Sequence, residues 1–480
     1  MSAAPACGSS DSSTGDDGGA GGDGSSGSSG CTGFCSDGGG PPPGCVGLGC
    51  MQVTCSDPTV STTLTGTVLD PAGKVPIFNA IVYVPQDNPP TLPPITDGAS
   101  CDKCDAKIQN AVAVTSTDTS GNFTLKNVPV VDNLPLVVQI GKWRRVVQLQ
   151  NTVQKCATAP IDPSVTRLPK SSTEGNIPKM AVTTGAADAL QCLLRKVGID
   201  DSEFGIAGSA ARIHLYQGGG FNNGTDQIAT SKLASGPTFP KADTLWSDAA
   251  KLGAYDVVIL GCEGAENDGA TYAGATKPDA SKTAMYDYAK AGGRIFMSHY
   301  HEVWLRTNPD AAVSGVASYL TPIDSVPPPA SPSNPKTTAI NADISTAFAK
   351  GQAMSDWLGK QGSLVSGKLP IFDARDDVNS VTTAGLSWIT TTNPNNANKA
   401  AVEYMSFTAP VGAAEADVCG RVVLSDIHVS GGTTTDSATA DFPTGCTSDP
   451  LNAQQKALEF MLFDLSSCIE TTQGGVDVPH

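Results

Sequence analysis

The stretch AGGRIFMSHYHEVW, from Ala291 to Trp304, carries the strongest fold signal in this sequence. Its glycine pair is followed by the apolar run Ile295–Met297 and then by the polar run Ser298–His301. This order predicts a buried strand that ends abruptly and delivers polar side chains at its carboxyl end. Because ligands of open α/β sheets bind at the carboxyl ends of the strands, we expect these histidines at a ligand-binding crevice.

Strand-like and helix-like segments alternate from residue 177 to residue 470. The further strands that we expect are 179–183, 211–216, 255–260, 370–373, 401–407 and 421–425, and the helices are 187–197, 282–291 and 449–465. Such alternation, with apolar strands, predicts a mostly parallel sheet with helices on both faces. An eight-fold βα barrel is the alternative. We disfavour it because Ser/Pro/Asn-rich stretches at 307–340 and 390–400 stand in place of regular repeats.

Residues 57–156 have the pattern of a small all-β sandwich. The strands that we expect there are 64–69, 80–84, 112–117, 122–125, 136–140 and 143–149. Short strands at this spacing are typical of sandwiches. A proline-rich insertion at 87–110 carries Cys101 and Cys104. A linker at 157–176 leads to the α/β domain, and residues 471–480 form a tail.

The N-terminal residues 1–44 consist mainly of Gly, Ser, Asp and Thr. A segment with so few apolar side chains cannot offset the entropy of ordering, so we expect a disordered tether. Its start, MSAAPAC, resembles the end of a bacterial lipoprotein signal peptide, with Cys7 as the lipidated residue. The alternative is that Cys7 is one more cysteine of a linker. We therefore expect an exported protein, either a lipoprotein of the outer membrane or cell surface or an extracellular protein.

The chain has 14 cysteines and a formal net charge of −17. This cysteine content indicates an oxidising compartment and disulfides, some of them in a short Cys-rich segment at 45–56. The negative charge argues against nucleic acid as a partner, and against a membrane except through a lipid anchor. If disulfides form within each part of the chain, the α/β domain keeps one unpaired thiol. We expect that thiol to be Cys262, which ends a buried strand.

Two motifs in the all-β part resemble the carboxypeptidase regulatory-like (transthyretin-like) β-sandwich. They are GTVLDPAGKVPIFNAIVYV, from Gly66 to Val84, and TDTSGNFTLKNVP, from Thr117 to Pro129. The resemblance implies a structural or binding module without catalytic residues of its own.

Three motifs in the α/β part resemble the class I glutamine amidotransferase-like fold, a flavodoxin-like arrangement, and are most similar to its trehalose-utilisation (ThuA-like) branch. They are YDVVILG (255–261), YAKAGGRIFMSH (288–299) and GRVVLSDIH (420–428). True amidotransferases place a nucleophilic cysteine at the sharp turn after the strand that matches Ile295–Met297. In this chain His299 stands at that position, as is usual in the ThuA-like branch, so we expect no glutaminase activity. His428 falls near the family's C-terminal histidine.

Three interpretations of the histidines compete. In the first, His299, His301 and His428 bind a divalent metal with a carboxylate from Glu263, Glu302 or Asp426. In the second, His299 and His428 are catalytic acid–base residues that act on a small ligand such as a carbohydrate. In the third, the histidines and Tyr300 are hydrogen-bonded core or rim residues of a degenerate pocket. The side chains expected around the pocket are Cys262, Glu263, Ser298, Tyr300, His301 and Asp426.

The sequence thus favours an exported cell-surface protein that binds a small molecule, a surface glycan or another polymer through a catalytically degenerate domain. The alternative is a hydrolase-like enzyme that acts on a carbohydrate or an amide through the histidine cluster, with or without a metal. Asp373, Asp376 and Asp377 are expected in a solvated loop, with a calcium site in the same crevice as the alternative.

Overall fold

The computed structural model describes residues 44–104, 108, 110–151, 153–220, 229–267, 275–320, 323, 339–375, 377–392, 400–429, 436–470 and 472–476. All of them belong to one compact unit, Pro41–His480. The predicted tether and its Cys7 lie outside the described residues. The boundaries that we expect inside the unit stay predictions.

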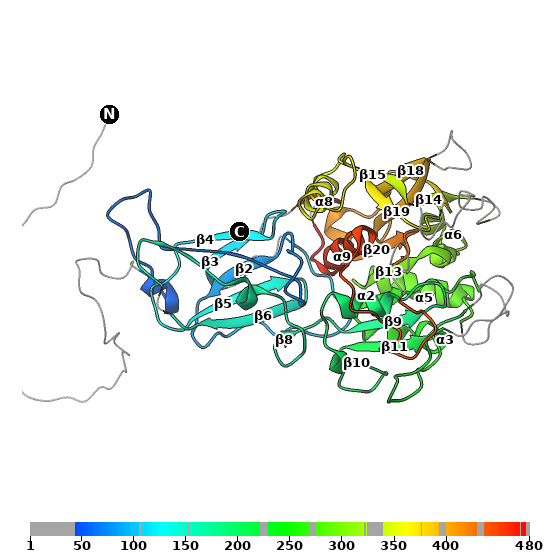
Figure 1. The fold of residues 1–480 in the computed structure, drawn as a ribbon, viewed down its shortest axis with the longest axis horizontal. Helices are drawn as coiled ribbons and strands as arrows, with labels where there is room; N and C mark the ends of the chain where they lie inside the picture. Colours follow the sequence, from blue (N-terminus) through cyan, green and yellow to red (C-terminus); the bar gives the residue numbers. More distant parts are fainter. Residues whose placement is uncertain are drawn as a thin grey trace, which may run out of the picture. The chain divides into compact units, whose positions relative to one another are not determined.

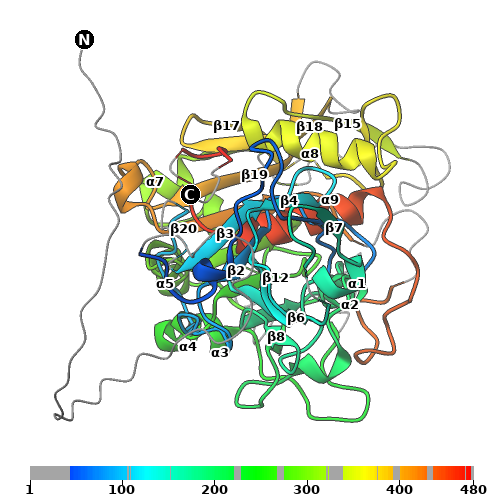
Figure 2. The ribbon, with the colours of Figure 1, turned by 90° about the vertical axis from the view of Figure 1, so that its left-hand side faces the viewer.

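Two sheets form the N-terminal part of this unit. A three-stranded sheet has the order β4-β1-β7, and a five-stranded sheet has the order β3-β2-β5-β6-β8. The strands are β1 (Thr63–Thr67), β2 (Ile81–Pro85), β3 (Ala111–Ser116), β4 (Asn122–Lys126), β5 (Leu134–Ile140), β6 (Trp143–Leu149), β7 (Thr158–Pro160) and β8 (Gly175–Asn176). Each strand predicted from the sequence here is confirmed, with its ends displaced by two residues or fewer. Figure 2 views the unit from the side of these sheets.

A ten-stranded sheet forms the C-terminal part, in the order β10-β11-β9-β12-β13-β20-β19-β18-β15-β16. Its strands are β9 (Met180–Thr184), β10 (Phe204–Gly205), β11 (Ile213–Gln217), β12 (Val257–Leu260), β13 (Arg294–Ser298), β15 (Ile340–Ile344), β16 (Leu369–Ile371), β18 (Gly385–Thr392), β19 (Ala400–Ala409) and β20 (Gly420–Ser425). The order runs from an edge at β10 to an edge at β16, so the described sheet is open and is not a barrel.

The sheet is only partly parallel, whereas the sequence predicted a mostly parallel one. Neighbouring strands from β10 to β20 are parallel, and those from β20 to β16 are antiparallel. The parallel strands β12, β13 and β20 are buried at every position, but β15 and β18 are partly exposed. Strands with a partly exposed face suit antiparallel pairing, and their weaker apolar pattern explains why β15 and β18 were not predicted.

Helices cover both faces of the ten-stranded sheet (Figure 1). Side chains alternate along a strand, so Ile259 and Phe296 belong to the apolar cluster that includes α2, α8 and α9, and Val258 and Ile295 belong to the one that includes α3 to α6. These helices are α2 (Leu190–Lys196), α3 (Asp243–Trp246), α4 (Ala249–Gly253), α5 (Asp279–Lys290), α6 (Val303–Arg306), α8 (Ala349–Lys360) and α9 (Ala453–Ser466). The short elements outside these layers are α1 (Pro163–Thr166), α7 (Ala311–Ser314), β14 (Ala317–Tyr319), β17 (Val378–Val381), η1 (Gly47–Met51), η2 (Asp201–Glu203), η3 (His299–Glu302) and η4 (Glu415–Asp417).

The described residues form five disulfides and leave Cys262 as a buried free thiol. The pairs are Cys45–Cys50, Cys55–Cys156, Cys101–Cys419, Cys104–Cys468 and Cys192–Cys446. The free thiol is the one predicted, but the premise that pairing stays within each part of the chain was wrong. The number of disulfides is consistent with an exported protein. None of the described helices is long and apolar enough to cross a bilayer.

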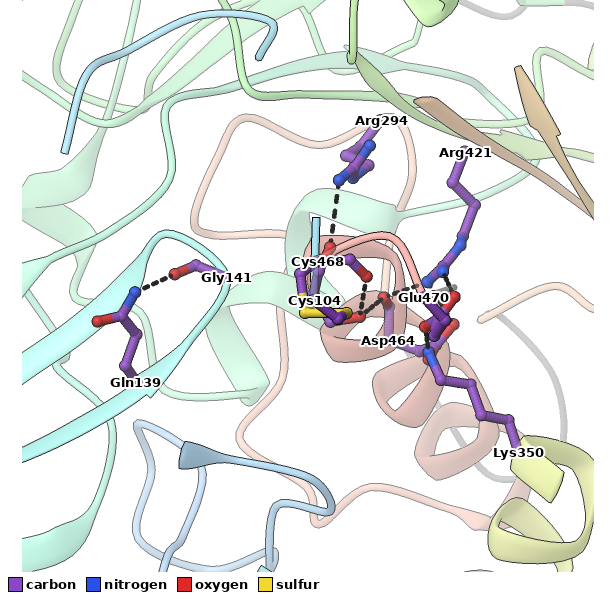
Figure 3. Close-up of a disulfide and its surroundings, with 10 residues drawn as sticks. Cys104, Gln139, Gly141, Arg294, Lys350, Arg421, Asp464, Cys468 and Glu470 are labelled. Atoms are coloured by element: carbon purple, nitrogen blue, oxygen red, sulfur yellow. Dashed lines mark hydrogen bonds and ion pairs between the residues drawn. A yellow bond between two sulfur atoms is a disulfide. The ribbon is translucent and has the colours of Figure 1, made fainter. Parts of the chain in front are cut away.

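Two of these disulfides cross from the proline-rich insertion to the C-terminal part because the insertion lies along the end of the chain. Cys104 N donates to Ile469 O over 2.9 Å, and Ile469 N donates to Asp102 O over 2.8 Å. Figure 3 shows the Cys104–Cys468 disulfide beside the buried ion pairs that Asp464 and Glu470 form with Lys350 and Arg421.

Candidate metal centre

Three neighbouring parallel strands end at the same level and deliver the candidate residues. Leu260 of β12 pairs with Met297 of β13, and Ser298 of β13 pairs with Ser425 of β20. Cys262, His299 and His428 follow these strand ends within three residues. Segments that lie far apart in the sequence therefore meet at one edge of the sheet, as expected for the carboxyl ends of parallel strands.

His299 occupies a sharp turn between β13 and η3. Its φ is 43°, in the left-handed region that residues other than glycine rarely adopt. Backbone strain of this kind gathers at functional sites, because the surrounding structure has to hold it in place.

Cys262, His299 and His428 bring three ligand atoms together, namely the Cys262 Sγ and one ring nitrogen of each histidine. These atoms all lie within 4.8 Å of one another, and the side chains are buried. Cys262 Sγ lies 3.4 Å from His299 Nδ1, and the two imidazole rings lie 5.0 Å apart between centroids. Ligands bonded to zinc at about 2.0–2.3 Å lie roughly 3–4 Å from one another, so only small shifts separate this arrangement from a zinc site.

A carboxylate lies behind each imidazole. His299 Nε2 lies 2.9 Å from Asp377 Oδ2, and His428 Nδ1 lies 3.8 Å from Asp373 Oδ2. Neither ring nitrogen of His428 has a hydrogen-bond partner among the described residues, and Nδ1 is the one that faces Asp373. A carboxylate that faces the outer nitrogen of a histidine is the usual support for a metal-binding imidazole, because it fixes the ring and raises its basicity. His299 Nδ1 and His428 Nε2 are thus the nitrogens left for a metal.

The thiol and the imidazoles also shift one another's pKa. Burial raises the pKa of the Cys262 thiol, but His299 and His428 more than offset this effect and bring the pKa to about 6. Burial lowers the pKa of His428, but Asp373 and the Cys262 sulfur more than offset it and raise the pKa to about 9. Cys262 is therefore mainly a thiolate at neutral pH, and the thiolate is the form that binds metals.

Two further buried carboxyls lie close to the three ligands. Asp188 and Asp426 are 0% and 1% exposed, and burial raises the pKa of both. Asp188 accepts hydrogen bonds from Ser298 Oγ and Val429 N, and Asp426 accepts one from Asp377 N. A divalent cation between the thiolate and the imidazoles would favour ionisation of these carboxyls by supplying a nearby positive charge.

His301 does not join this group, and this corrects the metal interpretation of the sequence. Its Nε2 lies 2.9 Å from Gly261 O, and its Nδ1 accepts a hydrogen bond of 3.0 Å from Trp304 Nε1. Both ring nitrogens are thus used within the protein. Burial lowers the pKa of His301 to about 4, so the ring is neutral.

The other residues expected around the pocket are divided between the centre and the core. Glu263 is held by Lys277 Nζ at 2.7 Å and by Asn267 Nδ2 at 2.8 Å. Tyr300 packs on His299, with ring centroids 4.0 Å apart. Ser298 Oγ donates to Asp188 Oδ2 over 2.6 Å. Glu302 is buried and contacts Arg306, and Asp426 Oδ2 accepts a hydrogen bond from Asp377 N.

Sequence reasoning missed the supporting carboxylates. Asp373 and Asp377 were expected in a solvated loop, yet they are 6% and 0% exposed and face the two histidines, while Asp376 lies outside the described residues. The run of acidic residues directly after β16 was the available signal. The sequence did not predict a role for Asp188, because its local sequence resembles that of an ordinary solvent-exposed turn before a helix.

No known protein family, curated protein or solved structure matches this chain.

Proposed function

We propose that this protein is an exported metalloprotein that holds one divalent transition metal at Cys262, His299 and His428. The observation that carries the proposal is the convergence of one sulfur and two imidazole nitrogens within 4.8 Å, from the ends of three adjacent strands. In this proposal the metal site belongs to a flavodoxin-like, amidotransferase-like domain of the ThuA-like kind. A carboxypeptidase regulatory-like sandwich precedes that domain.

The donor set favours zinc among the common metals. One thiolate and two imidazoles are borderline-soft ligands that suit zinc, whereas calcium and magnesium prefer oxygen ligands. Three protein ligands leave a fourth position open, and a zinc ion with an open position activates water or polarises a carbonyl. The activity that fits this centre is the hydrolysis of an amide or a carbohydrate substrate.

The remaining residues of the centre have separate tasks in this proposal. Asp377 and Asp373 hold the two imidazoles in place from their outer nitrogens. Asp426 Oδ1 has no hydrogen-bond partner among the described residues, and burial raises the pKa of this carboxyl well above its usual range. A raised pKa favours the protonated form of the Asp426 carboxyl, and a protonated carboxyl beside the centre can deliver a proton to a leaving group.

A second candidate uses the same residues without a metal. Cys262, His299 and Asp377 follow one another in the order of a thiol hydrolase, with 3.4 Å from Sγ to Nδ1 and 2.9 Å from Nε2 to Oδ2. In such an arrangement the imidazole activates the sulfur and the carboxylate orients the imidazole. Metal binding and thiol catalysis exclude each other, because both use the Cys262 sulfur.

Metal analysis of the full chain, purified without chelators, tests the proposal. The expected result is one metal per chain, lost in Cys262→Ser and in His428→Gln. His214→Gln is the matched control: His214 is also a buried strand histidine, but it bonds to Tyr255 Oη at 2.8 Å, away from the centre. Absence of metal from the wild-type protein, together with failure to bind added zinc or cobalt, would overturn the proposal.

The two candidates separate in an activity assay with chromogenic aryl amides and aryl glycosides. Hydrolysis by the zinc-loaded protein that disappears on chelation supports the metal centre. Hydrolysis by the metal-free protein that zinc suppresses and iodoacetamide abolishes supports the thiol hydrolase. Metal binding with no hydrolysis would leave metal binding as the function and remove the hydrolase.

A further inference from the structure

One two-residue segment, Ala187–Asp188, hydrogen-bonds to all three segments that carry the proposed ligands. Ala187 N donates to Cys262 O over 3.0 Å. Asp188 Oδ2 accepts a hydrogen bond of 2.6 Å from Ser298 Oγ, and Asp188 Oδ1 accepts one of 2.9 Å from Val429 N.

Ala187 bonds to the backbone oxygen of Cys262, whereas Asp188 bonds to the neighbours of the two histidines rather than to the histidines themselves. Ser298 directly precedes His299, and Val429 directly follows His428. The two oxygens of a single carboxyl thus tie together strand ends whose residues lie 110 and 241 positions away from Asp188 in the sequence.

We propose that Asp188 is a positioning residue that sets the spacing of His299 and His428 around Cys262 and so pre-organises the three ligands for a metal. This inference rests on the proposed function. Asp188 contacts no ligand atom in this scheme; it acts through the backbone and through Ser298. Residues that hold the ligands of a metal from behind set the orientation of those ligands, and losing one such residue typically lowers metal affinity by about 10–100-fold.

The cost of burying Asp188 argues against a purely structural role. The side chain is 0% exposed, and burial raises the pKa of its carboxyl. An apolar side chain would fill the same space without that penalty, so a buried carboxyl at this place indicates a requirement for its two acceptor oxygens.

Two substitutions separate geometry from charge. Asp188→Ala removes both hydrogen bonds, and we expect it to weaken cobalt(II) and zinc binding by about 10–100-fold and to shift the visible spectrum of the bound cobalt(II). Asp188→Asn keeps an acceptor for Val429 N and can donate to Ser298 Oγ, so we expect it to retain most of the affinity and the wild-type cobalt spectrum. Ser298→Ala removes one of the two hydrogen bonds to Asp188, so we expect a metal affinity between those of the wild-type protein and Asp188→Ala.

Glu203→Gln and Glu203→Ala are the matched controls. Glu203 is a buried carboxyl in the same part of the chain, and it likewise accepts one backbone and one hydroxyl hydrogen bond, from Ser172 N at 2.6 Å and Ser172 Oγ at 2.7 Å. We expect these controls to change the melting temperature of the metal-free protein without changing metal affinity or the cobalt spectrum.

The outcomes distinguish this inference from the proposed function. If the wild-type protein binds no metal, the proposed function fails. If it binds metal and Asp188→Ala binds it with the same affinity and the same spectrum, only the positioning role is overturned. An equal loss in Asp188→Asn and Asp188→Ala would also overturn it, because the charge and not the hydrogen-bond geometry would then matter. Should Asp188→Ala not fold, the comparison of Ser298→Ala with the wild-type protein decides the question by the same spectrum.

Discussion

His299 Nε2 lies 2.9 Å from Asp377 Oδ2, and both side chains are almost fully buried. The pair joins the sharp turn after β13 to the segment just before β17, so a carboxylate fixes the one ring whose backbone lies in the left-handed region. Its opposite ring nitrogen is thereby held toward Cys262. The orientation of the His299 ring therefore depends on two segments that lie far apart in the sequence.

We expect Asp377→Asn to weaken metal binding by about 10–100-fold, because the amide supports the imidazole less well than the carboxylate does. A competition titration against a chromophoric chelator measures the loss. Asp70→Asn, a buried aspartate in the N-terminal β part, is the control and should leave metal affinity unchanged. An unaltered affinity in Asp377→Asn would show that the carboxylate plays no part in the centre.

Asp70 makes the stability of the protein depend on pH. Burial raises the pKa of Asp70 to about 6, despite hydrogen bonds from Lys74 N and Val75 N, and Glu459 of α9 is a neighbouring carboxyl. The native state therefore binds the proton more tightly than the unfolded chain, whose pKa is near 3.8. The associated stability is fully present below about pH 4 and is lost as the pH rises through about 6.

The shift from 3.8 to about 6 corresponds to about 3 kcal/mol of stability. We expect Asp70→Asn to gain stability relative to the wild-type protein between pH 4 and pH 7, as measured by urea unfolding at each pH. Glu459→Gln should also reduce the pH dependence of stability, because burial raises the pKa of the Glu459 carboxyl as well. A difference between wild type and Asp70→Asn that stays constant over this range would contradict the prediction.

Two disulfides, Cys101–Cys419 and Cys104–Cys468, tie the same short insertion to the C-terminal part. Each of them can therefore hold the insertion in place when the other is lost. With one of them intact, loss of the other frees only a modest loop, so each Cys→Ser pair alone should cost less than removal of both. We expect the combined loss to exceed the sum of the single losses in thermal unfolding. The Cys45–Cys50 bridge spans a sequence separation of 5 and serves as the control with a small effect. A combined loss of stability equal to the sum of the two single losses would show that the two disulfides act independently.

The buried ion pair between Lys277 and Glu263 should be costly to break on one side only. Nζ and Oε2 lie 2.7 Å apart, and the side chains are 0% and 1% exposed. We expect Lys277→Met to destabilise the protein by about 3–5 kcal/mol, because it leaves the Glu263 carboxylate buried and unpaired. The double variant Lys277→Met with Glu263→Gln should recover part of this loss in urea unfolding. Equal losses in the single and double variants would refute the argument.

Comparison of His299 with His301 explains how far the sequence could predict the centre. Residues two apart share a side if a strand continues, and on that basis both histidines were expected together. The strand β13 ends at Ser298 and the 3-10 helix η3 begins at His299, so this alternation no longer applies. His299 turns to Cys262 and His301 turns to Gly261 O. Cys262, by contrast, was identified as the free thiol because it ends an apolar strand.

The strands and helices with a strong apolar pattern were predictable from the sequence alone, because apolar periodicity is a local property of each segment, whereas β15, β18 and α8 were not predicted. The position of chemically active residues after strand ends was predictable for the same reason. The sequence did not predict which of these residues meet, namely Cys262, His299, His428, Asp377 and Asp188. Those contacts depend on β13 lying between β12 and β20 and on loops that return to the sheet from far along the chain. The order of the strands in the sheet and the positions of these loops result from the packing of the whole unit. No local sequence pattern predicts that packing.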